Sequence, residues 1–457
     1  MLCLSFFPSL SSNLNLLYIE AKRGKSGLPV FPLFRAVIIP SMNTNSTLVT
    51  HDILLEKLTY GGEAMGRLPD GRAVFVPFGL PGETVRVRLT QEKQSFARGE
   101  LLEILTASSE RIDPKCKHFG KCGGCHYQNL SYVNQRQAKT EILRDQLQRI
   151  GKIENPTINP IIASPLEWNY RNHVQFHLTA EGKIGFMNSK GNSALPIEEC
   201  HLPETSIDSF WRDLQFESNK DIERVSLRAG RDEELMVLLE SESPEAPELE
   251  IEADVSVVHL FDEHPVVIAG RDHFVITILE KDFRVSAASF FQVNTKMAEK
   301  MVQHLLTCLP ISLSTTLLDI YCGVGLFSKF FAPKSKLVIG IESAESACED
   351  FAFNLDEFDN VELYEGAAEE ILPGLAVRLD SSTYMIVDPP RAGIEKHALD
   401  AIISIKPQTI AYVACDPSTL ARDAARLING GYKLKEVTPF DLFPQTYHIE
   451  SISIFER

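Results

Sequence analysis

The stretch "LLDIYCGVGLFS", residues 317–328, has the pattern of a buried strand that runs into a glycine turn and then a helix. Gly323 and Gly325 allow the backbone to pass close to a ligand. One strand later, Glu342 ends "LVIGIE", a position at which an acid can accept hydrogen bonds from both ribose hydroxyls. The loop lacks the full G-x-G-x-x-G pattern and a P-loop lysine, which argues against dinucleotides and nucleoside triphosphates. A short loop and an acid suit S-adenosylmethionine (AdoMet), which has a ribose but no phosphate.

The chain around this stretch, from about residue 283 onward, alternates between strands and helices. Its seven β runs are "TTLLDIYCGVG", "KLVIGIES", "NVELYEG", "YMIVDPP", "TIAYVACDP", "YKLKEVTPF" and "ESISIFER". This order predicts an α/β fold with a doubly wound, seven-stranded sheet that ends in a β pair. Ligands of such sheets lie beyond the carboxyl ends of the strands. The candidate residues at these ends are Asp319, Tyr321, Cys322, Glu342, Asp388 and Cys415.

The region between residues 48 and 105 has a different pattern, made of short alternating β runs. Turn-forming residues separate the runs at 61–62, 69–71 and 80–82. About five short strands of this kind predict a small barrel of the OB type, a shape that often binds nucleic acid. Exposed arginines would suit such a surface, namely Arg72, Arg86, Arg88 and Arg98. A purely structural β module is the alternative.

A group of cysteines follows the barrel in "CKHFGKCGGCHYQ" and continues in "PIEECHLP". The thiols are those of Cys116, Cys122, Cys125 and Cys200. Four thiolates suit a zinc ion or an iron–sulfur cluster. One long gap, one short gap and a remote fourth cysteine favour a 4Fe–4S cluster over zinc, and merely buried cysteines are the remaining alternative. His118 and His126 lie close by and are interpreted as surface or RNA-facing residues.

A separate cysteine signal is "TIAYVACDPSTLARD" at 409–423, where Cys415 lies at the point at which a buried strand opens into a loop. A small hydrophobic residue would also fit there. The neighbouring strand is expected to end at Asp388 in "VDPPRAG", where Arg391 replaces the aromatic residue typical of amino-methylating enzymes. Glu450 enters the last strand pair in "FPQTYHIES".

A thiol and a carboxylate beside an AdoMet site match the chemistry of uracil C5. This carbon is a poor nucleophile, but thiolate addition to C6 yields an enolate that can attack the methyl sulfonium. A base must then remove the C5 proton so that the cysteine can leave. One cysteine and one glutamate are what this reaction needs.

The chain resembles the TRAM-domain RNA uracil-5-methyltransferase family, in the branch that carries a 4Fe–4S cluster. The matching motifs span residues 48–457 and are "LTYGGEAMGRLPDGRAVFVPF", "CKHFGKCGGCHYQ", "YRNHVQFHL", "SFFQVN", "LLDIYCGVGLFS", "VDPPRAG", "YVACDPSTLARD" and "FPQTYHIE". The resemblance implies a class I AdoMet-dependent enzyme that methylates uracil C5 in structured RNA. Bacterial 23S rRNA is the implied substrate, with tRNA as the alternative.

The resemblance also implies roles for individual residues. Cys415 is the implied nucleophile and Glu450 the implied base. The implied AdoMet contacts are Gln292, Tyr321, Glu342 and Asp388. The implied cluster ligands are Cys116, Cys122, Cys125 and Cys200. The expected parts are an extension at 1–41 that is disordered or absent from the native protein, a TRAM barrel at 42–106, a central α+β domain with the cluster at 107–282, and the methyltransferase domain at 283–457.

Three positions depart from the family pattern. Asp416 stands where the family usually has asparagine, and its charge is expected to raise the pKa of the neighbouring thiol unless Arg391 offsets it. Leu326 stands where a polar residue often follows the glycines, and 367–368 are alanines where an Asn or Asp often touches adenine. Asp416 also leaves a cytosine-C5 enzyme open as an alternative, because such enzymes usually have an acid at ring N3.

Composition and charge set the remaining expectations. The 457 residues carry a net charge of −17, but 18 acidic and five basic residues lie within 201–270, so the N-terminal third can still bind RNA. No apolar run approaches the roughly 20 residues that span a bilayer. Nine unevenly spaced cysteines do not suggest a disulfide framework and favour a reducing, cytoplasmic setting. We expect a monomer without membrane association or an obligate protein partner. An iron–sulfur RNA-binding protein without catalysis is the alternative from a different class.

Overall fold

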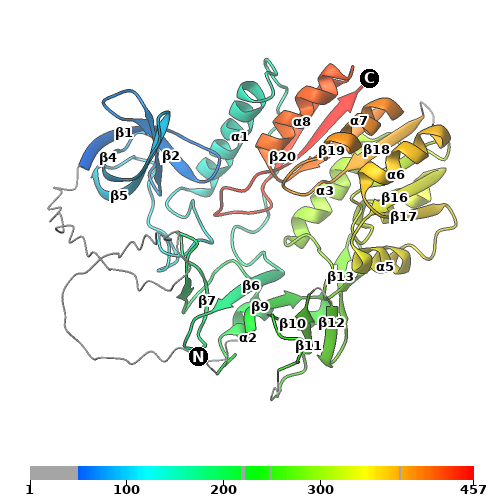
Figure 1. Ribbon diagram of the computed structural model, residues 1–457, viewed down its shortest axis with the longest axis horizontal. Coiled ribbons are helices and arrows are strands. Elements are labelled where there is room, and N and C mark those ends of the chain that lie inside the picture. The colour runs from blue at the N-terminus through cyan, green and yellow to red at the C-terminus, as the bar shows by residue number, and fades with distance from the viewer. Residues whose placement is uncertain (1–49, 218–221, 248–249, 251, 263, 380–381) are drawn as a thin grey trace, which may run out of the picture. The chain divides into compact units, whose positions relative to one another are not determined.

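The computed structural model describes residues 50–217, 222–247, 250, 252–262, 264–379 and 382–457 (Figure 1). The extension predicted for 1–41 lies outside the described residues. None of the helices in these ranges combines the length and the apolar character that a membrane crossing requires.

The first five strands close into a barrel. They are β1 (Thr50–Leu58), β2 (Glu63–Arg67), β3 (Ala73–Pro77), β4 (Thr84–Glu92) and β5 (Phe96–Thr106). Around the barrel the order is β1-β2-β3-β5-β4, and β3 pairs with β5 in parallel. Alternate residues fill the interior, as Val74 and Val76 do on β3 and Val85 and Val87 on β4. The predicted five-stranded barrel is confirmed.

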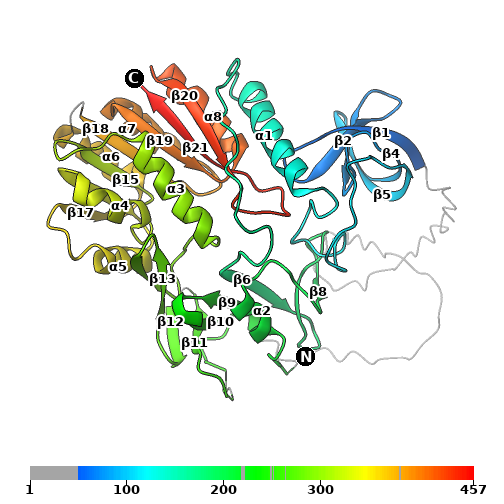
Figure 2. The same cartoon turned by 180° about the vertical axis from the view of Figure 1, so that it is seen from behind.

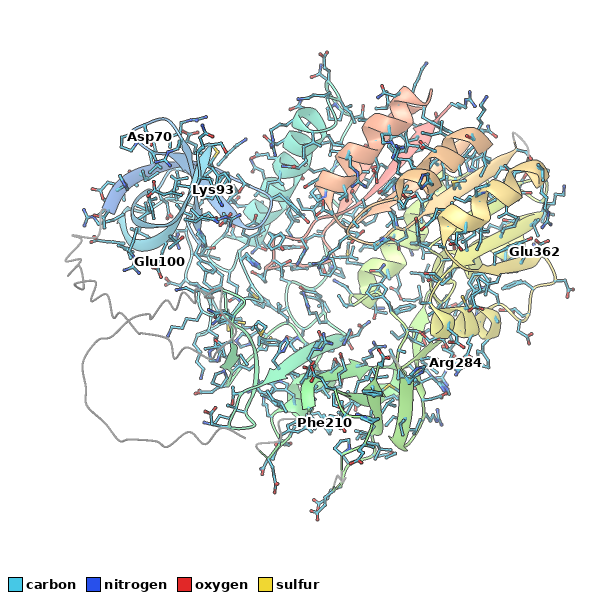
Figure 3. The ribbon with its side chains drawn as sticks, in the orientation of Figure 1. Asp70, Lys93, Glu100, Phe210, Arg284 and Glu362 are labelled. Carbon is cyan, nitrogen blue, oxygen red and sulfur yellow. The ribbon has the colours of Figure 1, made fainter. Side chains whose placement is uncertain are left out.

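The barrel arginines are paired with carboxylates on neighbouring strands and turns. Arg72 pairs with Asp70 and Glu92, Arg86 with Asp52 and Glu103, Arg88 with Glu100, and Arg98 with Glu63 (Asp70 and Glu100 are labelled in Figure 3). Arg88 and Glu100 lie directly opposite each other in the β4–β5 register, which sequence spacing does not reveal. At these positions the barrel therefore presents ion pairs, and the four arginine side chains keep 26–50% of their surface exposed.

A second sheet follows in the order β12-β11-β10-β9-β6-β7-β8. Its strands are β6 (His173–Leu178), β7 (Ile184–Met187), β8 (Ala194–Pro196), β9 (Ile222–Ala229), β10 (Leu235–Ser241), β11 (Ser256–Phe261) and β12 (His264–Ala269). Helix α2 (Thr205–Trp211) contributes Ile207 and Trp211 to the core of this sheet. The hairpin of β13 (His273–Ile278) and β14 (Lys281–Ser286) then leads to the third sheet.

The third sheet has seven strands in the order β17-β16-β15-β18-β19-β21-β20. They are β15 (Thr316–Ile320), β16 (Leu337–Glu342), β17 (Val361–Glu365), β18 (Thr383–Val387), β19 (Thr409–Ala414), β20 (Lys433–Phe440) and β21 (Glu450–Glu456). The first five of these strands in the chain pair in parallel, whereas β21 runs antiparallel to both β19 and β20. All seven predicted β runs are confirmed, including the terminal pair.

Helices cover both faces of the third sheet, as Figures 1 and 2 show. They are α3 (Thr295–Cys308), α4 (Leu326–Phe331), α5 (Glu345–Asn354), α6 (Ala368–Leu375), α7 (Lys396–Ile405) and α8 (Pro417–Asn429), with the short 3-10 turns η2 (Ala332–Lys334) and η3 (Ala376–Arg378); a further 3-10 turn, η1 (Arg231–Glu233), joins β9 to β10 in the second sheet. Adjacent strand residues face opposite cores: Leu317 joins the core of α3 and α4, and Leu318 joins that of α6, α7 and α8. Burial on both faces explains why these strands are continuous apolar runs.

Helix α1 (Tyr132–Arg149), which follows the cysteine motif, also belongs to the core of the third sheet. Its residues Ile142, Leu143 and Leu147 are buried in the same cluster as residues of α8, and the two helices lie side by side in both views (Figures 1 and 2). The cysteine segment is therefore held against the third sheet by the helix that continues it.

A buried ion pair ties the barrel to the segment that leads toward the cysteines. Glu83, which is fully buried just before β4, accepts from Arg111 Nε at 2.6 Å and Nη2 at 2.8 Å, and from the backbone N–H of Leu80 at 2.9 Å. These hydrogen bonds outweigh burial and hold the pKa of Glu83 below its usual range.

We expect Arg111→Met to destabilise the protein by about 3 kcal/mol at neutral pH, because it leaves a buried carboxylate without its cation. The folded pKa of Glu83 is lowered, so its stabilising effect is present above the unfolded pKa and is lost as pH falls. The difference from wild type should therefore shrink in acid. Thermal unfolding at pH 7 and pH 4 measures it. Arg72→Met, which breaks an exposed pair, is the matched control and should change the melting temperature little.

Candidate active site and cysteine site

The thiol and the carboxyl singled out in the sequence lie at neighbouring strand ends. Cys415 follows the last residue of β19, and Glu450 is the first residue of β21. Because Ala414 lies opposite Ser451 in the antiparallel register, the next positions outward are Cys415 and Glu450. Asp388 follows β18, which pairs with β19 on its other side. Three candidate residues thus meet at one edge of the sheet, as predicted.

The electrostatics of this edge oppose ionisation of the thiol and the carboxyl. Burial, followed by Glu450 and Asp388, raises the pKa of Cys415 to about 12, and Arg391 acts in the opposite direction. Burial also raises the pKa of Glu450 well above its usual range; Asp388 adds to this and Arg391 again opposes it. Arg391 is therefore a cation that favours the thiolate and the carboxylate together.

Asp416 has a different place from the one expected of a charge beside the nucleophile. It is the N-cap of α8, where its Oδ1 accepts from the backbone N–H groups of Ser418 at 2.8 Å and Thr419 at 2.9 Å. The main causes that raise the pKa of Cys415 are burial, Glu450 and Asp388, and an effect of Asp416 on this pKa stays a prediction. The predicted opposing effect of Arg391 is present.

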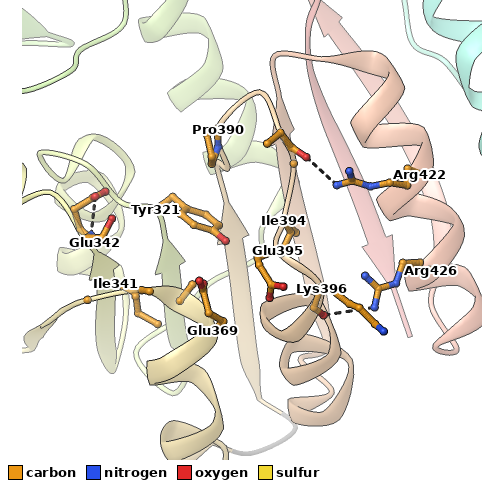
Figure 4. Close-up of a pocket in the computed structure, with 16 residues that line it drawn as sticks. Tyr321, Ile341, Glu342, Glu369, Pro390, Ile394, Glu395, Lys396, Arg422 and Arg426 are labelled. Atoms are coloured by element: carbon orange, nitrogen blue, oxygen red, sulfur yellow. Dashed lines mark hydrogen bonds between the residues drawn. The ribbon is translucent and has the colours of Figure 1, made fainter. Parts of the chain in front are cut away.

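A cavity of about 720 Å³ opens beyond the strand ends that precede the nucleophile (Figure 4). Among the residues lining it are Tyr321, Glu342, Ala367, Ala368 and Pro390. Glu342 Oε2 accepts from the backbone N–H of Gly323 at 2.9 Å, so the acid and the glycine loop meet as the sequence predicted. Leu326 is buried in the apolar core on the α4 side and does not line this cavity.

Carboxyl groups without basic partners surround the glycine loop. Asp319 is fully buried; its Oδ2 accepts from the N–H and hydroxyl of Ser328, and its Oδ1 has no partner among the described residues. Burial raises the pKa of Asp319 to about 7, and burial followed by Asp319 and Glu342 raises that of Asp388 to about 7. Such a group of acids favours a ligand that brings positive charge.

Gln292 lies two residues before Asn294, the N-cap of α3. The side chain of Asn294 accepts from the N–H of Met297, so the motif "SFFQVN" leads into a helix. The backbone carbonyl of Gln292 accepts from Asn172 Nδ2 at 3.0 Å, which connects this segment to the central sheet. An AdoMet contact by its side chain stays a prediction.

All four candidate metal-ligating cysteines line one cavity of about 280 Å³. They are Cys116, Cys122, Cys125 and Cys200. In the described part of the chain, no three His, Cys, Asp or Glu side chains are arranged to hold a single metal ion. A zinc ion needs sulfurs at about 2.3 Å from one centre, whereas an iron–sulfur cube spreads its four thiolates around a larger body. The four thiols share one cavity, and the kind of metal site that they would form stays a prediction.

The two histidines near these cysteines are not free surface groups. His118 Nε2 accepts from the backbone N–H of Glu198 at 3.0 Å. The ring of His126 contacts that of Tyr447 edge-on, with centroids 4.6 Å apart, and burial followed by Lys139 lowers its pKa to about 4. The interpretation of His126 as a surface or RNA-facing residue is corrected, because the loop before Glu450 covers it.

Sequence reasoning missed Asp423, which connects α8 to the loop after β18. This fully buried carboxylate accepts from the N–H of Ile394 at 2.9 Å, from the hydroxyl of Tyr412 at 2.9 Å and from Arg422 Nε at 2.8 Å. A signal was available: Asp423 stands three residues after Leu420, on the apolar stripe of its helix, where a charge needs buried partners.

The raised pKa of Cys415 predicts slow alkylation in the unliganded protein. At neutral pH the thiolate is scarce, so the rate with iodoacetamide should keep rising up to about pH 10 and should not level off near the ordinary thiol pKa of about 8.5. Peptide mass spectrometry of the Cys415 peptide measures the rate, with N-acetylcysteine as the reference thiol. A plateau near pH 8 would contradict the prediction.

Comparisons with known proteins agree with this arrangement. The tRNA (uracil-5-)-methyltransferase family matches residues 271–457, and the TRAM domain matches residues 49–102. An uncharacterized RNA methyltransferase of Halalkalibacterium halodurans is 31% identical over 442 residues, which cover 89% of this chain and 96% of the relative. One of Bacillus cereus is 32% identical over 443 residues, covering 89% and 96%.

A solved structure has the same fold over most of the chain. It is that of Pyrococcus abyssi tRNA (uracil-54, C5)-methyltransferase in complex with S-adenosyl-L-homocysteine, which matches with a TM-score of 0.67 and 24% identity. The match covers 88% of this chain and 99% of that one. The match and the relatives of similar length cover both the barrel and the third sheet. The chain therefore belongs to the TRAM-containing family of RNA (uracil-5-)-methyltransferases.

Proposed function

We propose that this enzyme uses AdoMet to methylate uracil C5 in structured RNA, with Cys415 as the nucleophile and Glu450 as the base. The observation that carries the proposal is the register of β19 and β21, in which Ala414 lies opposite Ser451. This register brings the thiol and the carboxyl to the same strand edge as Asp388. The target uracil must leave its stack in the RNA to reach these two groups.

The reaction then follows from the two groups. The thiolate of Cys415 adds to C6, and the electrons of the C5=C6 bond form an enolate whose C5 takes the methyl group from the sulfonium of AdoMet. The carboxylate of Glu450 removes the C5 proton, the C–H electron pair re-forms the C5=C6 bond, and the thiolate leaves. Arg391 supports both groups because it lowers the pKa of each.

The acids around the glycine loop support AdoMet as the methyl donor. Its sulfonium and amino groups are cations, and Asp319, Asp388 and Glu342 supply carboxyls whose mutual repulsion a cation would relieve. Tyr321 and Glu342 line the cavity that would hold the nucleoside part. We assign Gln292 to the same site on the strength of the family resemblance.

We propose bacterial 23S rRNA as the substrate and the cytoplasm as the setting. The support is the resemblance to the branch that has both a TRAM domain and a cysteine cluster; the described cysteines are free thiols, as a reducing compartment requires. The second candidate is tRNA, which the matching family and the P. abyssi enzyme both carry in their names. We propose that the chain acts as a monomer with domains 42–106, 107–282 and 283–457.

Two alternatives receive less support. A binding protein without catalysis would not need Cys415 and Glu450 at adjacent strand ends. A cytosine-C5 enzyme would need an acid at ring N3, but the Asp416 carboxylate is engaged by the N-terminus of α8.

Covalent trapping tests the proposed reaction. With AdoMet and 5-fluorouracil-containing 23S rRNA or tRNA transcripts, the wild-type enzyme should form an adduct on denaturing gels, since fluorine at C5 cannot leave as a proton. Cys415→Ala should form none. Glu450→Gln should form an adduct with ordinary RNA and lose roughly 10²- to 10⁴-fold in turnover, the usual contribution of a general base.

The matched control is Cys308→Ala, a thiol on α3 away from the site, which should behave as wild type. The RNA that traps identifies the substrate class. An adduct that persists in Cys415→Ala would contradict the assignment of the nucleophile.

We propose that Cys116, Cys122, Cys125 and Cys200 hold a 4Fe–4S cluster. The support is their shared cavity and the family resemblance of the motif that carries three of them. Burial raises the pKa of Cys125 and that of Cys200 to about 12, and Arg171, which lines the same cavity, acts in the opposite direction on both. When bound, such a cluster would cross-link the cysteine segment to the central sheet.

Anaerobic reconstitution with iron and sulfide should load about four iron ions per chain and give the broad visible absorption of a cluster. Cys125→Ser should lose most of this absorption, whereas Cys308→Ser should keep it. Metal analysis of the protein purified without oxygen is the measurement. One equivalent of zinc with no iron would overturn the cluster in favour of a zinc site.

A further inference from the structure

The loop that leads to Glu450 is contacted by the end of the cysteine motif, by α1 and by Tyr170. We call residues 441–449 the base loop. The backbone N–H groups of His126 and Tyr127 both donate to the carbonyl of Gln445, at 2.9 and 3.1 Å. Tyr170 donates its hydroxyl to the carbonyl of Pro444 at 3.0 Å. The base loop thus depends on contacts from outside the third sheet.

A reciprocal pair of glutamines joins the base loop to α1. Gln135 Nε2 donates to Gln445 Oε1 at 2.9 Å, and the Gln445 backbone N–H donates to Gln135 Oε1 at 2.9 Å. Gln135 Nε2 also donates to the carbonyls of Tyr127 and Leu130. Both glutamines are buried, and Gln445 has a φ of +69°, a conformation that costs energy for a residue with a side chain. The surrounding hydrogen bonds hold it there.

A buried ion pair repeats this contact one helical turn later. Lys139 Nζ donates to Asp441 Oδ1 at 2.6 Å and to the carbonyl of Phe443 at 2.9 Å, and both charged side chains have no exposed surface. Because Gln135 and Lys139 are four residues apart, they lie on the same face of α1. That face presents two polar side chains to the base loop. Their hydrogen bonds are directional and therefore select one conformation of the loop, which apolar packing alone would not do.

The geometry points to Gln135 and Lys139 as positioning residues for the removal of the C5 proton, acting through the base loop on Glu450. This inference rests on the proposed role of Glu450 as the base. The nucleophile is held by other elements. Cys415 lies between β19 and α8, and its neighbour Asp388 lies after β18. Loosening the base loop should therefore displace the carboxyl and leave the thiol in place.

The reaction sequence turns this separation into a measurable difference between steps. Addition of the thiolate and methyl transfer come first and do not need Glu450. The methylated intermediate, in which Cys415 is bonded to C6 and C5 carries both a proton and a methyl group, then waits for the base. When the base is displaced, this covalent adduct accumulates because its C5 proton is removed slowly.

The test compares Gln135→Met with Gln137→Met, using ordinary RNA and methyl-labelled AdoMet. Methionine keeps the size of glutamine but cannot form its hydrogen bonds, and Gln137 is an exposed residue of the same helix. Gln135→Met should form up to one equivalent of methyl-labelled adduct in a burst, with turnover roughly 10- to 100-fold lower. Gln137→Met should turn over as wild type does. Release of tritium from C5-labelled uridine should slow with turnover.

A second variant distinguishes a loss of positioning from a loss of stability. Lys139→Met with Asp441→Leu removes both charges of the buried pair, which avoids an unpaired buried charge. It should keep a melting temperature close to that of wild type and still accumulate the adduct. In Gln135→Met with Gln445→Met, the two effects should be less than additive, because both act through one contact.

The outcomes separate the two proposals. Equal losses of adduct formation and turnover in Gln135→Met, or no change in either, would overturn the positioning role. If wild type itself forms no adduct with any RNA, the proposed covalent function fails. Glu450→Gln provides the reference for a complete loss of the base.

Discussion

The antiparallel pairing of β21 with β19 is the constraint on which the proposed reaction depends. In a parallel sheet only the carboxyl ends of strands reach the ligand edge. Because β21 runs the other way, its first residue, Glu450, arrives at that edge beside Cys415. A thiol and a carboxyl on two parallel strands could also meet at this edge, but each would have to stand after the last residue of its strand. The terminal β pair instead supplies the carboxyl from a strand start, and the loop before that start then decides where the carboxyl lies.

Among the described residues, the site combines the acids Asp319, Asp388 and Glu450 with Arg391, whose charge opposes theirs. Burial and mutual repulsion raise the pKa of Asp319 and Asp388 to about 7 and that of Cys415 to about 12. A ligand with positive charge would relieve this repulsion, and Arg391 already opposes the rise in the pKa of Cys415 and of Glu450. The unliganded site is therefore poorly ionised, and a cationic methyl donor would favour the ionised forms that the proposed chemistry needs. The positive charge of the methyl donor would thus both favour its binding and favour ionisation of the thiol and the carboxyl.

Much of the fold and the site could be predicted from local patterns. Apolar runs of strand length gave the seven strands of the third sheet, and turn residues gave the barrel, because both signals depend on near neighbours. The failures involve partners far apart in the chain. Asp416 beside a cysteine suggested a repulsive charge, but it is the N-cap of α8. His126 followed a cysteine in a polar stretch and suggested a surface residue, but Tyr447 covers its ring. Arg88 was expected to be an exposed arginine of an RNA-binding surface, and only the strand register places Glu100 opposite it.

The sequence by itself determined the seven β runs and the glycine loop, and it predicted which thiol, carboxyl and cysteines are the candidate site residues, since spacing and residue type carry that information. Only the tertiary structure decided what holds these groups. In the sequence, Gln135 and Lys139 look like ordinary polar residues of a helix. The structure showed that they contact the loop before Glu450, at Gln445 and Asp441, which follow them in the chain by 310 and 302 residues. The physical reason is that a buried polar group is defined by its partner, and a partner so distant leaves no local trace in the chain.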